Sequence, residues 1–102
     1  MDVAVEVHVT GRVELGRFGE FATALEPWIS YRAEKGHAPV RVYQALSGSM
    51  NEVRMAFEYP DLAAYEREER EDAVDREYGR LAGAMPFVDG TLEYAIYVPI
   101  EH

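Results

Sequence analysis

The sequence contains no cysteine, and this absence excludes several kinds of site at once. A disulfide framework, a thiolate nucleophile and a zinc knuckle all require that residue. No apolar run approaches the roughly 18 residues of a membrane-spanning helix, and the first residues, Met1 to Val3, lack the basic head of a signal peptide. We therefore expect a cytoplasmic protein with no membrane partner.

Basic residues are also scarce. Ten lysines and arginines stand against 19 aspartates and glutamates, so the formal net charge at pH 7 is −9. Nucleic acids and anionic membranes are bound by clustered Lys and Arg, so this composition argues against both as partners. The chain has 102 residues, of which 48% are hydrophobic. That length supports one modest core, and we predict a single domain over residues 1–102.

A strict alternation of valine begins the chain. Val3, Val5, Val7 and Val9 are separated by small or polar residues. This period-2 pattern of β-branched residues predicts a strand with one apolar face. Three further alternating segments predict strands at about 39–46, 52–59 and 91–98, and the turn-rich loop between the first two of them is typical of a hairpin.

Helical patterns separate the strands. Apolar residues recur at three- and four-residue steps over about 17–35, with Pro27 inside, where we expect the helix to kink or restart. Asp61 is the expected N-cap of a second helical region, which Asp75 is expected to restart. The charged run over 66–72 is interpreted as a solvated helix surface.

This order of elements predicts a ferredoxin-like α+β domain, with a four-stranded antiparallel sheet and the helices on one face. Right-handed crossovers place the first strand between the third and the fourth. The helix-side face is almost wholly apolar, whereas the other face is polar apart from one alanine in each strand. Alanine is a poor strand former. We therefore interpret the second face as one that a second copy of the sheet covers.

At this point the chain resembles a known superfamily. Its order of elements, together with GSMNEV at 48–53 and FEYPDLAAYE at 57–66, is similar to NIPSNAP-like and antibiotic-biosynthesis-monooxygenase-like members of the dimeric α/β-barrel superfamily. The resemblance implies a homodimer whose sheets pack face to face around a cavity. Members include cofactor-free oxygenases, polyketide cyclases, lactone isomerases and haem-binding enzymes, and the fold alone does not choose between them. Haem-degrading members use a histidine on the second helix. This sequence has none there, and we expect no cofactor.

Candidate catalytic residues share the second face. His8 lies two residues from Glu6 and therefore on the same side of its strand, and imidazole is the side chain best suited to proton transfer near neutral pH. Arg54 and Glu93, on strands expected to flank His8, complete the predicted catalytic set. The predicted substrate-binding residues are Glu6, Tyr43, Glu58 and Tyr97.

Each candidate also has a structural interpretation. His8 could be hydrogen-bonded at a dimer interface, the charged residues could form ion pairs, and the tyrosines could pack. Glu6, His8 and Glu93 could in principle hold a metal, although the resembling family rarely does so, and we expect none. His37, which precedes the second strand, is expected at the surface.

Two functions from different classes remain open. The first is a small homodimeric enzyme of small-molecule metabolism, acting on an aromatic or polyketide-like substrate by proton transfer (cyclisation or isomerisation) or by cofactor-free oxygenation. The second is a non-catalytic ligand-binding or assembly protein of the same fold. Binding of a small molecule without turnover would favour the second.

Overall fold

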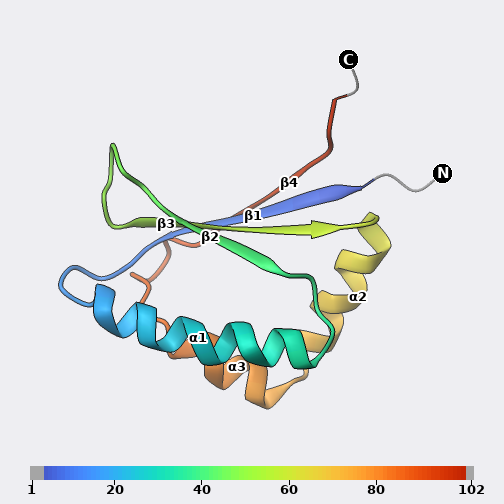
Figure 1. Ribbon diagram of the computed structural model, residues 1–102, viewed down its shortest axis with the longest axis horizontal. Coiled ribbons are helices and arrows are strands. Elements are labelled where there is room, and N and C mark those ends of the chain that lie inside the picture. The colour runs from blue at the N-terminus through green and yellow to red at the C-terminus, as the bar shows by residue number, and fades with distance from the viewer. Residues whose placement is uncertain (1–3, 101–102) are drawn as a thin grey trace.

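A computed structural model describes residues 4–100 as a sheet with helices packed on one side (Figure 1). The elements in chain order are β1 (Val5–Arg12), α1 (Phe18–Glu34), β2 (Val40–Gln44), β3 (Glu52–Tyr59), α2 (Leu62–Ala73), α3 (Arg76–Gly83) and β4 (Glu93–Tyr97). The predicted order is confirmed, with the second helical region divided in two. Val3, the first valine of the alternating pattern, lies outside the described residues.

The sheet has the strand order β2-β3-β1-β4, and every neighbouring pair is antiparallel. β1 therefore lies between β3 and β4, as right-handed crossovers require. Val7 pairs with Phe57 on β3, and His8 pairs with Ala56 on β3 and Ala95 on β4. This register confirms the predicted ferredoxin-like α+β sheet and sends the valines of β1 to one face and His8 to the other.

Helix α1 lies across the apolar face of the sheet (Figure 1). Its buried residues, Phe21, Trp28 and Arg32, recur at helical spacing. The helix runs through Pro27 without a break, so the restart considered from the sequence does not occur. Gly36 ends the segment with φ of 72°, a left-handed conformation that glycine adopts without a Cβ penalty.

Helices α2 and α3 begin at the predicted N-caps. The Asp61 carboxylate accepts a hydrogen bond from the backbone N–H of Ala64 at 2.7 Å. The Asp75 carboxylate accepts from the backbone N–H of Tyr78 at 3.2 Å and also from the Tyr31 hydroxyl at 2.7 Å. The second of these bonds ties α1 to the start of α3. Among residues 4–100, no helix combines the length and apolar character needed to cross a membrane.

The core lies between the sheet and the helices, but it does not extend over β4. Val7 of β1 and Val53 of β3 are each only 1% exposed. Tyr94 and Ile96 of β4 lie on the same side of the sheet, opposite Val9 and Val7. They are nevertheless 61% and 47% exposed. The apolar residues therefore face the helices as predicted. On the edge strand β4, however, Tyr94 and Ile96 remain largely exposed to solvent.

Candidate functional site

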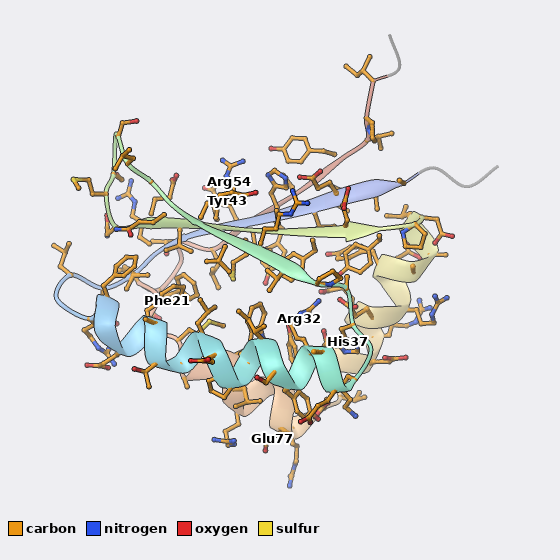
Figure 2. All side chains as sticks on the ribbon, in the orientation of Figure 1. Phe21, Arg32, His37, Tyr43, Arg54 and Glu77 are labelled. Atoms are coloured by element: carbon orange, nitrogen blue, oxygen red, sulfur yellow. The ribbon has the colours of Figure 1, made fainter. Side chains whose placement is uncertain are left out.

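The open face of the sheet brings His8, Glu6 and Arg54 into one hydrogen-bonded chain. Figure 2 shows Arg54 on the side of the sheet away from the helices. Its Nη1 lies 3.0 Å from Nδ1 of His8, and Nε2 of His8 lies 2.6 Å from Oε1 of Glu6. A guanidinium can only donate, so Nδ1 accepts and the neutral ring carries its proton on Nε2. The chain therefore runs Arg54 to His8 to Glu6, with each group donating to the next.

The Tyr97 ring, on the neighbouring strand β4, packs against the His8 ring of this hydrogen-bonded series. Its ring centre lies 4.8 Å from that of His8, with a 60° angle between the ring planes. The side chain of His8 is 19% exposed, compared with 45% for Glu6. The imidazole is thus partly shielded, while the carboxylate that accepts its hydrogen bond remains open to solvent.

The other three predicted site residues share the face through the strand register. Glu58 is paired with Glu6, Glu93 with Thr10, and Tyr43 with Arg54. Within the described part of the chain, no cluster of three or more histidine and acidic side chains could hold a metal ion. The structure thus joins four of the seven candidates directly and places the remaining three around them. Their catalytic and substrate-binding roles stay predictions.

A second cluster of polar side chains is buried on the opposite side of the sheet, where Arg32 of α1 meets α2. Nη2 of Arg32 donates to Oε2 of Glu68 at 3.0 Å and to the backbone oxygen of Ala38 at 2.8 Å. Oε1 of Glu68 accepts from the backbone N–H of Ala38 at 2.9 Å, and Oε2 accepts from the Tyr59 hydroxyl. Asp72 lies 3.9 Å from Nη1 of Arg32. These bonds fasten the connection between α1 and β2 to α2.

Two expectations from the sequence are wrong in this region. His37 is not a surface residue, because its side chain is 6% exposed and its Nε2 lies 2.8 Å from Oδ1 of Asp72. The charged run over 66–72 is not wholly a solvated surface, because Glu68 and Asp72, one turn apart, both face inward. They do so because Arg32 occupies the buried side of α1 and requires anionic partners there.

Burial and hydrogen bonding act in opposite directions on these acids. Burial alone would raise the pKa of Glu68, but hydrogen bonds from Tyr59, Ala38 and Arg32 outweigh it and lower that pKa below its usual value. The pKa of Asp72 is raised, chiefly by burial, although its hydrogen bond with His37 opposes the change. Burial and the hydrogen bond to Glu68 raise the pKa of Tyr59. Glu68 is therefore the firmly ionised acceptor of this cluster.

Two buried donors in the same region lack acceptors. Arg32 is 3% exposed and Trp28 is 2% exposed. Nε of Arg32 and Nε1 of Trp28 have no hydrogen-bond partner. Burial raises the pKa of the nearby Tyr78 phenol, and the charge of Arg32, followed by the indole N–H, opposes that rise in part. The indole N–H and the Tyr78 hydroxyl still do not meet the distance and angle of a hydrogen bond. Buried N–H groups without acceptors are uncommon in folded proteins.

The residues that carry both donors line a cavity between the sheet and the helices. Its volume is about 140 Å³, and aromatic side chains make up much of its wall. Figure 2 shows Arg32 in the space between α1 and the sheet. The guanidinium carbon of Arg32 lies 4.7 Å from the ring centre of Phe57 and 5.4 Å from that of Trp28. The aromatic residues of the wall are Trp28, Phe57, Tyr59, Tyr65, Tyr78 and Phe87, with Tyr94 at the edge.

The cavity reaches the surface beside β4. Tyr94 and Leu92 line it and are 61% and 44% exposed. Glu69 also lines it and is exposed. Burial, followed by the charge of Glu69, raises the pKa of Tyr94, and burial, followed by the charges of Asp72 and Glu68, raises the pKa of Glu69. The opening is therefore flanked by a carboxylate and a tyrosine whose ionised forms are both disfavoured.

Sequence reasoning missed this cavity, although one signal was present. Arg32 continues the apolar spacing of Phe21, Leu25 and Trp28 along α1. A charged residue in the buried stripe of a helix requires a partner. Glu68 and Asp72 are spaced four residues apart, which puts them on one helix face and made them candidates for that partner.

Comparison with known proteins gives structural matches without sequence matches. No family model matches the chain, and no match was found among curated proteins. A NIPSNAP family protein from Agrobacterium tumefaciens superposes with a TM-score of 0.83 at 13% identity, covering 99% of this chain and 90% of that one. A NIPSNAP-like domain protein from Burkholderia xenovorans gives 0.80 at 14% identity, covering 98% and 88%.

A third solved structure carries a different description. It is a "putative antibiotic biosynthesis monooxygenase" from Bordetella bronchiseptica, with a TM-score of 0.75 at 12% identity, covering 97% of this chain and 99% of that one. The fold is therefore that of NIPSNAP-like and antibiotic-biosynthesis-monooxygenase-like proteins, and the resemblance stated from the sequence is confirmed at the level of fold. At these sequence identities, structural similarity does not assign an activity to this protein.

Proposed function

We propose that this protein acts in small-molecule metabolism and that the helix–sheet cavity holds an aromatic compound. One observation carries the proposal: Trp28 and Arg32, two residues of the cavity wall, each have a buried N–H donor without an acceptor. Leaving buried donors unpaired costs free energy, about 1–3 kcal/mol for each group. A ligand that supplies an acceptor regains that energy on binding.

The size and lining of the cavity support an aromatic occupant. About 140 Å³ is close to the roughly 150 Å³ of an engineered apolar cavity that takes up benzene. Aromatic rings attract one another in tilted and edge-to-face arrangements. The walls already make such contacts, since the Trp28 and Phe57 rings are 6.2 Å apart at an interplanar angle of 87°. A flat ring entering beside β4 would extend that set of contacts.

The test uses Trp28, the single tryptophan of the chain. Titration with toluene should change its fluorescence and saturate, because the indole lines the cavity. Ala82→Phe should abolish the change, since Ala82 is also a lining residue and a phenyl group there would fill the space. The matched control is Ala84→Phe, at the exposed C-cap of α3. Equal binding by both variants would rule out the cavity as the ligand site.

A second candidate activity, proton transfer on the open face, is supported by the chain of hydrogen bonds through His8. A substrate that displaces Arg54 meets the lone pair on Nδ1. That nitrogen takes a proton from a C–H or O–H of the substrate, leaving the electron pair on the substrate. Glu6, bonded to Nε2, stabilises the resulting imidazolium, which then returns the proton at a new position. Such a cycle describes an isomerisation or a cyclisation.

In this second candidate, Arg54 and Glu93 flank the reacting group as further catalytic residues. Tyr43, Tyr97 and Glu58 would contact the substrate. The two candidate activities use opposite sides of the sheet, so variants of one face leave the other intact. Non-catalytic ligand binding is the alternative, and binding of toluene with no turnover of any tested compound would favour it.

We also propose that the protein is a homodimer joined through the open face. Tyr43 and Tyr97 are each 49% exposed there. Ala56, a small residue, is paired with His8 and Arg41 on that face. A stable interface would bury on the order of 800 Å² on each subunit. Light scattering at micromolar concentration should therefore return twice the 11.6 kDa chain mass, and a monomer would contradict the face-to-face model.

A further inference from the structure

We infer that the helix–sheet cavity selects a neutral, single-ring aromatic compound with a carbonyl oxygen, and that it rejects the corresponding carboxylate. This inference rests on the proposed function of the cavity and adds the charge and the hydrogen-bonding group of its ligand. Three observations lead to it: the polarity of the free groups, the charges around them and the volume available.

The buried polar atoms without hydrogen-bond partners on residues of the cavity wall are both N–H donors. Nε of Arg32 and Nε1 of Trp28 each carry one hydrogen without an acceptor. A carbonyl oxygen has two lone pairs and can accept from both. The guanidinium carbon of Arg32 lies 5.4 Å from the Trp28 ring centre, so the two side chains that carry these donors are neighbours in the cavity wall. A ligand with only donor groups would leave them unpaired.

The charge of Arg32 is already balanced by protein carboxylates. Its Nη2 is bonded to Glu68, and its Nη1 lies 3.9 Å from Asp72. Glu69 lines the same cavity near its opening. One guanidinium is thus faced by three acidic side chains within the described part of the chain. An anionic ligand would meet net negative charge in a partly dry site, where repulsion is stronger than in water.

The volume limits the ligand to about one ring. A space of about 140 Å³ holds a compound of benzene size with a small substituent. Larger ring systems would have to extend past Tyr94 and Leu92 into the opening beside β4. The ligand therefore has a single ring, with its carbonyl turned inward to Trp28 and Arg32.

The experiment titrates the full chain at pH 7 with benzamide, benzoate and toluene, using calorimetry. Benzamide and benzoate have nearly the same shape but differ in charge, and toluene has no acceptor. Benzamide should bind roughly 3- to 10-fold more tightly than toluene, the ratio expected for about one net hydrogen bond. Benzoate should bind more weakly than benzamide by at least the same factor.

Trp28→Phe identifies the donor. Phenylalanine keeps an aromatic ring at the site but removes the N–H, so the benzamide affinity should fall toward that of toluene while the toluene affinity changes little. Ser30→Ala, at an exposed position on the same helix, is the control and should leave all three affinities unchanged.

The outcomes separate this inference from the proposed function. Benzoate binding as tightly as benzamide, or toluene binding equally well, would overturn the inference while leaving an aromatic-binding cavity. Failure of all three compounds to bind would overturn both. A Trp28→Phe variant that keeps the wild-type preference for benzamide over toluene would also overturn the inference, because the indole N–H would then play no part in selection.

Discussion

Nη1 of Arg54 lies 3.0 Å from Nδ1 of His8, although the two residues are 46 positions apart in the chain. The contact depends on the register of β1 and β3, in which Arg54 is paired with Thr10, the next residue of the same face after His8. It fixes the neutral tautomer of His8, because the guanidinium leaves Nδ1 only the role of acceptor. Proton abstraction by Nδ1 of His8 therefore requires the displacement of Arg54.

His8→Gln tests whether this residue transfers protons. If it does, turnover should fall by roughly 10²-fold or more, while the melting temperature and the oligomeric state stay unchanged. Thr10→Val, on the same face of β1, is the control and should retain activity. Melting temperature and turnover are measured on the same preparation. An unfolded His8 variant, or a stable one with full activity, would count against the catalytic role.

Glu68→Gln should destabilise the protein, because it leaves Arg32 buried without its nearest anion. We expect a loss of about 3 kcal/mol at pH 7, measured by urea unfolding. Glu66→Gln, at an exposed position on the same helix, should change stability by no more than about 0.5 kcal/mol.

The effect of Glu68→Gln should depend on pH. The folded protein holds the pKa of Glu68 below its ordinary value of 4.5. The ionised carboxylate therefore contributes stability that is present above pH 4.5 and is lost as the pH falls through the lowered folded value. The gap between wild type and variant should be largest near neutral pH and shrink below pH 4.5. A gap that stays constant down to strongly acidic pH would mean that packing, not charge, causes the loss.

The sheet could be predicted from the sequence because its signals are local. Alternation over β1 and β3 fixes which residues share a face, and a glutamate two residues from His8 must lie on the same side. The same reasoning could not predict the contacts among Arg32, Glu68 and Trp28. Their contacts depend on how α1 and α2 turn toward each other over the sheet, which periodicity does not specify. The burial of His37 could not be predicted for the same reason, because its partner Asp72 lies on α2.

Pro27→Ala should stabilise the protein by about 1–2 kcal/mol. Helix α1 continues through Pro27, which cannot donate to the carbonyl of Thr23. Alanine restores that bond and relieves the ring clash, although it also gives the unfolded chain more freedom. Thermal unfolding of the variant beside Glu26→Ala, a change at an exposed neighbour, measures the difference. A large loss of stability would show instead that the core is packed around the proline.

Gly11→Ala should narrow the cavity from the sheet side. A Cβ at Gly11 would lie 2.7 Å from Cδ2 of Leu92, closer than real Cβ contacts, and 3.0 Å from Cδ1 of Phe87, a tight contact. Leu92 is 44% exposed and can move, so we expect a modest destabilisation of about 1 kcal/mol. Both residues line the cavity, so toluene affinity should fall as they shift.

Gly79→Ala is the matched control for Gly11→Ala. Gly79 lies within α3, and a Cβ there meets open space. Alanine should therefore stabilise the helix by up to about 1 kcal/mol and leave toluene binding unchanged. Chemical unfolding and calorimetric titration are run on both variants. If Gly11→Ala binds toluene as wild type does, Leu92 and Phe87 do not shape the binding space. If both variants weaken binding equally, the loss comes from glycine replacement in general and not from the cavity wall.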